Sequence, residues 1–120
     1  MVSLVLGASE NTERYSYKAV ERLQSNGYEV VAVGRKEGEV LGVPIQTQFP
    51  KNTDIHTLTL YLSPKNQQVW EDAILALQPK RVIFNPGTEN PPFSQRLAAK
   101  GIAVQQACTL VLLATNQYES

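Results

Sequence analysis

Short apolar runs alternate along the chain with segments whose apolar residues recur at helical spacing. Compact apolar runs at residues 2–6, 28–33, 81–85 and 102–104 predict buried strands. The alternating, β-branched and aromatic segment 56–62 predicts another strand, and residues 43–49 fit a third, short one. Each strand is followed within a few residues by glycine, proline or small polar residues, which are typical of turns.

Helices are predicted between most of these strands. The first begins near Tyr15 or Ser16, buries apolar residues in 19–23, and ends before Gly27. The second follows a cap at Ser63 and Pro64, and its inward stripe comprises Val69 or Trp70, Ala73, Ile74 and Leu77. The third carries two prolines in its first turn and directs inward Phe93, Leu97 and Ala98. A short last helix is expected over residues 107–113.

Strands that alternate with helices predict βαβ units and therefore a parallel sheet. Right-handed crossovers then place helices on both faces, which makes a three-layer α/β sandwich. We expect a Rossmann-like parallel sheet of about five strands in the order 3-2-1-4-5. The pattern shows no internal repeat or linker, so residues 1–120 are expected to form a single domain.

The composition of the chain limits the kinds of molecule that it is expected to bind. The 11 basic and 11 acidic side chains balance, so bulk charge favours neither nucleic acid nor an anionic membrane. A hydrophobic content of 42% suffices for a core, while the longest apolar run is too short to cross a bilayer. We expect no signal peptide, and the single cysteine, Cys108, suits a cytoplasmic protein without internal disulfides. Because the net charge is zero, a site for an anion would have to depend on residues that lie next to it and not on the overall charge of the chain.

The first strand-to-helix turn has the parts of a phosphate site. Gly7 allows a tight turn, and Ala8 and Ser9 are small enough for an anion to approach the backbone amides. The following helix offers its unpaired amides, Arg14 a guanidinium and Ser16 a hydroxyl. An ordinary strand-to-helix connection favours the same residue types, so the local pattern alone leaves both interpretations open.

The turn after the second strand adds positive charge. Gly34 is followed by Arg35 and Lys36, where NAD-dependent enzymes place an acidic residue on the ribose hydroxyls. Positive charge there suits a phosphorylated ribose, as found in NADP and in coenzyme A (CoA). A solvated basic turn is the alternative. A dinucleotide needs two mononucleotide halves or a partner, so the length of the chain favours CoA.

Five segments carry a more specific signal, and they read GASENTERYSYKAVERLQSNGYEVVAVG, GVPI, HTLTLYLSPKNQ, PKRVIFNPGTENP and GIAVQQACTLVLL. Together they resemble the small, stand-alone CoA-binding proteins, which are similar to the CoA-binding domain of the succinyl-CoA synthetase α subunit. The resemblance covers nearly the whole chain, and GAS…RYSYKAV and NPGTEN are its most specific parts.

The resemblance implies a role for each turn. The CoA diphosphate would lie on Gly7, Ala8, Ser9, Arg14 and Ser16. The adenosine and its 3′-phosphate would lie by Gly34, Arg35 and Lys36, where many relatives have Asn-Pro instead of Gly34-Arg35. The adenine or pantetheine side would be lined by Ser63, Pro64, Asn85, Pro86 and Gly87. The synthetase also uses a second domain with a phosphorylated histidine, which this chain does not supply.

Catalytic chemistry is not evident in the sequence. His56, the only histidine, is predicted at the strand edge away from the ligand, and no cluster has metal-ligand spacing. Cys108 lies beyond the last strand, where it is either a small buried side chain or a thiol able to pair with that of CoA. We therefore expect a module that binds CoA or acyl-CoA and is non-catalytic or partner-dependent, the partner being either a second copy of the chain in a homodimer or another protein. An NADP-type redox sensor or oxidoreductase subunit, or a ligand-free interaction domain, are the alternatives.

Overall fold

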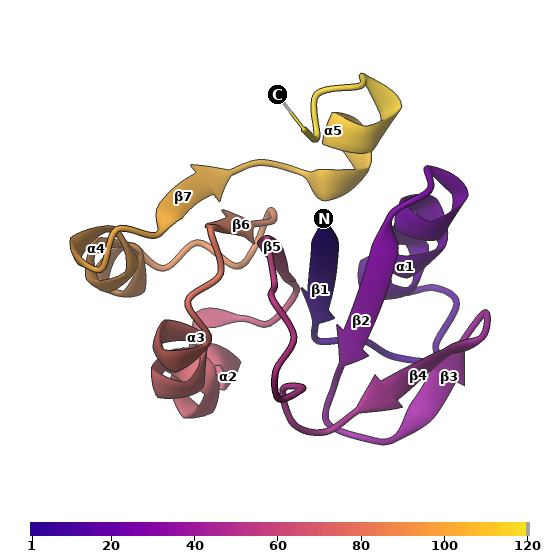
Figure 1. The fold of residues 1–120 in the computed structure, drawn as a ribbon, viewed down its shortest axis with the longest axis horizontal. Coiled ribbons are helices and arrows are strands. Elements are labelled where there is room, and N and C mark those ends of the chain that lie inside the picture. Colours follow the sequence, from indigo (N-terminus) through magenta and orange to yellow (C-terminus); the bar gives the residue numbers. More distant parts are fainter. Residues whose placement is uncertain (120) are drawn as a thin grey trace.

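The structure, a computed structural model, describes residues 1–119 and contains one sheet with helices on both faces (Figure 1). The strands are β1 (Val2–Leu6), β2 (Glu29–Val33), β3 (Gly38–Val40), β4 (Val43–Gln46), β5 (Thr57–Leu60), β6 (Arg81–Phe84) and β7 (Ala103–Gln106). The helices are α1 (Tyr15–Ser25), α2 (Pro64–Gln67), the 3₁₀ turn η1 (Gln68–Trp70), α3 (Glu71–Leu77), α4 (Pro91–Ala99) and α5 (Thr109–Ala114).

The predicted α/β, Rossmann-like fold is confirmed. Across residues 1–119 the sheet has seven strands in the order β3-β4-β2-β1-β5-β6-β7, and all neighbours but β3 and β4 pair in parallel. This order contains the predicted arrangement, with β4 as its third strand. Successive strands are added on one side of β1 up to β4 and on its other side from β5 onward, so the strand order reverses between β1 and β5. Ligands bind at such a point in open sheets of this kind.

The estimate of about five strands was too low, chiefly because β3 was missed. β3 pairs antiparallel with β4 through a two-residue turn at Leu41 and Gly42, whose φ angles are 49° and 88°. Such turns normally carry Asn or Gly at the first position, so leucine hides the hairpin signal. β4 is also shorter than the predicted residues 43–49, because it pairs with β2 only through Ile45 and Gln46.

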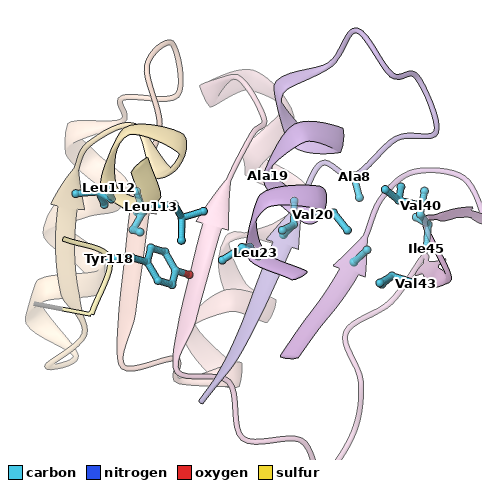
Figure 2. Packing of buried hydrophobic residues seen from close by; sticks show 13 residues of the cluster. Ala8, Ala19, Val20, Leu23, Val40, Val43, Ile45, Leu112, Leu113 and Tyr118 are labelled. Atoms are coloured by element: carbon cyan, nitrogen blue, oxygen red, sulfur yellow. The ribbon is translucent and has the colours of Figure 1, made fainter. Parts of the chain in front are cut away.

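Two apolar layers hold the sheet between its helices. Figure 1 shows α1 and α5 on one side and α2, α3 and α4 on the other. On the first side the apolar cluster extends from Tyr118 and α5 across α1 to Val40 and Ile45 of the β3–β4 hairpin (Figure 2). On the other side Leu4 and Leu6 meet residues of α3 and α4. Alternate residues of β1 thus serve both layers, as expected for a central strand.

Some predicted inward positions were wrong. Ala73 and Ala98 are exposed, whereas Ile74, Phe93 and Leu97 are fully buried. The second predicted helix is divided into α2, η1 and α3, and the change of helix type at residues 68–70 shifts the phase of the apolar stripe. The last helix starts at Thr109 rather than at residue 107.

Tyr118 closes one end of the first apolar layer. Its ring packs edge-on against Tyr28 with centroids 5.0 Å apart, and the Arg81 guanidinium lies 4.7 Å from its centroid. Its hydroxyl hydrogen-bonds the hydroxyl of Ser3, with the two oxygens 2.7 Å apart. A buried phenol needs such a partner, so the segment after α5 is attached to β1 by both packing and a polar contact.

Candidate ligand-binding groove

A groove of about 970 Å³ lies along the carboxyl edge of the sheet. This volume is at the upper end of the range for small-molecule sites. The lining residues come from the turns after β1, β2, β4, β5 and β6, and they are residues 6–10, 14–16, 34–37, 45, 47, 61–63, 66, 69–70 and 86–88. The turns predicted from the sequence to carry a ligand therefore meet in one place.

The first turn is shaped by contacts with the end of β2. The amides of Gly7 and Ala8 both donate to the Val33 carbonyl oxygen, at 2.9 and 3.0 Å. Gly7 has a φ of 99°, which favours glycine. Gly7 and Ala8 line the groove, but their amides are already engaged. The amides of Ser9 and Glu10 have no acceptor within residues 1–119, so they are the donors that this turn leaves for an anion.

The loop before α1 is ordered by its own side chains. The Asn11 amide donates to Ser9 Oγ at 3.1 Å, and the Glu13 amide donates to Asn11 Oδ1 at 3.0 Å. These contacts hold Arg14 at the start of α1, where its exposed side chain makes no capping hydrogen bond. Anions bind helix N-termini readily, and Arg14 adds a full positive charge to that of the helix dipole.

The first turn of α1 adds two further donors to the groove. In the described chain the amides of Tyr15 and Ser16 find no acceptor. Ser16 lines the groove although the residue is only 3% exposed. Together with Ser9 and Glu10, four backbone amides and the Arg14 guanidinium lie along one wall.

Gly34 explains how the first two turns come so close together. A Cβ atom at this position would lie 2.3 Å from the carbonyl oxygen of Ala8, which no real side chain allows. The Gly34 amide donates to the Gln46 carbonyl oxygen at 2.8 Å, so this residue also joins β2 to β4. Gly34 is buried, and its lack of a side chain lets the backbone of the first turn pack directly against it.

Two basic side chains follow Gly34 in the groove. Arg35 and Lys36 are both exposed and both line it, and their predicted contact with a ribose phosphate stays a prediction. Two carboxylates, Glu10 and Glu37, line the same region. The end of β2 therefore presents charges of both signs and not the purely basic surface that its own sequence indicates.

A fully buried side chain joins the other two walls. Gln67 Nε2 donates to the carbonyl oxygens of Leu62 and Thr88, each at 2.8 Å, and Gln67 Oε1 accepts from Asn90 Nδ2 at 2.8 Å. These bonds tie the turn after β5 to the NPGTEN loop after β6. Ser63 lines the groove at the start of α2, whereas Pro64 does not.

The NPGTEN loop contributes Pro86 and Gly87 to the groove, as predicted. Asn85 instead lies beneath it. Asn85 Nδ2 donates to Thr59 Oγ1 at 2.7 Å and to the Leu60 carbonyl oxygen at 2.9 Å. Its Oδ1 accepts from the Thr109 amide at 2.9 Å. Every polar atom of this side chain thus has a protein partner, and the roles predicted for Asn85 and Pro64 in ligand contact stay predictions.

Sequence reasoning missed several residues of the groove. Helical periodicity suggests that Val69 or Trp70 packs inward, yet both line the groove and Val69 is 85% exposed. Tyr15, for which the sequence leaves packing over a ligand and packing on the sheet equally open, also lines the groove and is 67% exposed. Tyr61 also lines the groove, and burial raises the pKa of its hydroxyl to about 12. The exposed apolar positions follow from where α1 and η1 begin, which the apolar pattern alone does not specify.

The remaining candidates lie elsewhere. His56 precedes β5 at the opposite edge of the sheet, with Nδ1 2.8 Å from Thr57 Oγ1. Burial, with Arg81 as the next contribution, lowers the His56 pKa. Cys108 is half-buried at the start of α5 and is not a lining residue. Residues 1–119 hold no group of three side chains able to bind a metal ion, and no helix among them is long and apolar enough to span a membrane.

Comparison with known proteins identifies the family. The model of the CoA binding domain family matches residues 2–114. The chain belongs to this CoA-binding domain family. No functionally curated protein matches it.

Solved structures share the fold of this CoA-binding domain. An uncharacterized protein of known crystal structure is 48% identical, with a TM-score of 0.93 over 97% of this chain and 96% of that one. The protein called cell-free ID.343 from Thermus thermophilus is 23% identical, with a TM-score of 0.86 over 97% and 89%. A dinucleotide-forming acetyl-coenzyme A synthetase from Ca. Korarchaeum cryptofilum is 13% identical, with a TM-score of 0.73 over 86% of this chain and 25% of that one.

Proposed function

We propose that the groove binds coenzyme A or an acyl-CoA, as a module that is non-catalytic or that acts with a protein partner. The observation that carries this proposal is the group of hydrogen-bond donors without acceptors at the first turn, in a chain of the CoA-binding domain family. Four free backbone amides, of Ser9, Glu10, Tyr15 and Ser16, lie there beside Arg14. A diphosphate offers several acceptor oxygens and two negative charges, which match these donors.

The rest of CoA fits the remaining turns. Arg35 and Lys36 lie at the end of β2, one strand away from the diphosphate turn, where they would bind the 3′-phosphate of the adenosine. The pantetheine arm would follow the turns after β5 and β6, past Ser63 and Gly87. Gln67 holds these two turns together, so that wall is formed before the ligand arrives.

An NADP-type ligand is the second candidate, because Arg35 and Lys36 suit a 2′-phosphate as well as a 3′-phosphate. Under this alternative the chain is a redox sensor or an oxidoreductase subunit. The sheet itself does not separate the two ligands, because β4-β2-β1 and β5-β6-β7 supply both halves of a dinucleotide-binding order, and it is the family that favours CoA. The two ligands differ in where the extra phosphate is attached, so one titration series separates them.

Isothermal titration calorimetry of the purified protein with CoA, acetyl-CoA, dephospho-CoA and NADPH tests the proposal. We expect CoA to bind at least tenfold more tightly than dephospho-CoA, since a contact to a charged group contributes about 1.5–3 kcal/mol. The double substitution Arg35→Ala and Lys36→Ala should remove that difference, whereas the exposed Lys100→Ala, outside the groove, should leave it unchanged. Tighter binding of NADPH than of CoA would refute the proposal.

A further inference from the structure

The carboxylate of Glu10 lies against the start of β3, beside the turn that follows β2, although Glu10 belongs to the loop after β1. The Glu39 amide donates to Glu10 Oε2 at 3.0 Å, across 29 positions of the sequence. A Cβ atom on Gly38 would lie 2.6 Å from Glu10 Cδ, so the side chain occupies space that only glycine leaves open. The structure thus supplies an acid at the strand end where the sequence shows only basic residues before Glu37.

This carboxylate keeps one oxygen without a hydrogen-bond partner among residues 1–119. Glu10 lines the groove and is exposed, and within residues 1–119 its second oxygen, Oε1, accepts no hydrogen bond. A carboxylate in an anion-binding groove repels the phosphates of a ligand unless it makes a contact of its own. The contact that suits it is a hydrogen-bond donor, because an ionised carboxylate only accepts.

We propose that Glu10 accepts a hydrogen bond from the free ribose hydroxyl of the bound nucleotide and so determines ligand specificity. This inference rests on the proposed function. The Glu10 amide is one of the four donors assigned to the diphosphate, and the ribose is bonded directly to that diphosphate. The pantetheine arm on the other side of the diphosphate also carries a hydroxyl, but its proposed path past the turns after β5 and β6 leads away from β3, where the Glu10 carboxylate lies. The ribose hydroxyl is therefore the ligand donor that suits this carboxylate. In CoA the 3′ position carries the phosphate, which leaves the 2′-hydroxyl for Glu10.

The basic and acidic side chains beside the turn after β2 then have different roles in binding. Arg35 and Lys36 attract the ribose phosphate, while Glu10 accepts from the hydroxyl beside it. A phosphate in place of that hydroxyl would lose the hydrogen bond and meet the carboxylate charge directly. Glu10 accordingly selects for a 3′-phosphorylated ribose and against a 2′-phosphorylated one. The Glu39 amide and the missing side chain of Gly38 position the carboxylate for this contact.

A double-mutant cycle on protein and ligand tests the inference. The ligands are adenosine 3′,5′-bisphosphate and its 2′-deoxy analogue, and the proteins are the wild type, Glu10→Ala and Glu13→Ala. Glu13 is an exposed carboxylate of the same loop that does not line the groove, so Glu13→Ala is the matched control. Any change in loop structure affects both ligands and cancels in the cycle, which leaves only the contact with the 2′-hydroxyl.

We expect the wild type and Glu13→Ala to bind the ribonucleotide about tenfold or more tightly than its deoxy analogue. In Glu10→Ala this preference should fall below about twofold, because the acceptor is gone. Equal affinity of the wild type for both ligands, with CoA still bound, would overturn the inference and leave the proposed function standing. So would a Glu10→Ala variant that binds both ligands more tightly by the same factor, since Glu10 would then only repel phosphate. Absence of CoA binding would refute the proposed function itself.

Discussion

Gln67 is the buried side chain that joins two walls of the groove, and the substitution Gln67→Leu tests how much that junction contributes to stability. Gln67 is 0% exposed and makes three hydrogen bonds of 2.8 Å. It donates to the Leu62 and Thr88 carbonyl oxygens and accepts from the side-chain Nδ2 of Asn90. Leucine has a similar volume, so the change leaves no large cavity and isolates the polar contribution.

The expected loss follows from these bonds. Each typical intramolecular hydrogen bond contributes about 1 kcal/mol, so three contribute about 3 kcal/mol. Thr88 is itself buried, and a carbonyl oxygen without a partner costs about 1–3 kcal/mol, while the apolar surface of leucine offsets about 1 kcal/mol. We expect Gln67→Leu to lower the free energy of unfolding by about 3–5 kcal/mol, a large fraction of the usual total of about 5–15 kcal/mol.

Urea denaturation followed by circular dichroism measures this loss directly. The neighbouring Gln68 is exposed, which makes Gln68→Leu a control of identical chemistry one residue away. That control should change the free energy of unfolding by less than about 0.5 kcal/mol. If both variants unfold at the same urea concentration, the three bonds do not hold the groove together and the reasoning is wrong.

Three further predictions concern individual residues. Arg14→Ala should weaken CoA binding by about 1.5–3 kcal/mol in calorimetry, whereas Arg22→Ala on the same helix should not, and equal affinities would place Arg14 outside the site. Gly34→Ala should destabilise the protein by about 1–3 kcal/mol or more in urea, because the new methyl group meets the Ala8 carbonyl; an unchanged midpoint would contradict this close approach. Since burial raises the Tyr61 pKa from 10.0 to about 12, the stability that its neutral form contributes is present below pH 10 and is lost as pH rises through about 12. Tyr61→Phe should lose less stability over this interval, and a parallel loss in both proteins would exclude Tyr61 as the cause.

Local sequence determined much of the architecture. Strands buried on both faces are mostly apolar, which is why residues 2–6 and 81–84 are predicted as strands from their own composition, although Ser3 and Arg81 interrupt the pattern. Gly7 marked the first turn because a φ of 99° is unfavourable for other residues, and the RK pair after Gly34 marked the second. The parallel order of the strands then places the predicted turns on one edge of the sheet.

Tertiary structure alone decided which groups of those turns are free to bind. The amides of Gly7 and Ala8 are used by Val33, and the Asn85 side chain is used by β5 and α5, so residues of the right type are already paired. The sequence could not show this, because each partner is contributed by a different strand or helix.

The same distinction applies to the charges and the walls of the groove. Sequence alone determined that basic residues follow β2 and that a glycine turn precedes α1. Only the fold brings Glu10 to Glu39 and Gln67 to Thr88, pairs separated by 29 and 21 positions. Periodicity depends on neighbours along the chain, whereas these contacts depend on which strands lie side by side. Hydrogen-bond partners and charge positions in the groove are therefore properties of the folded sheet.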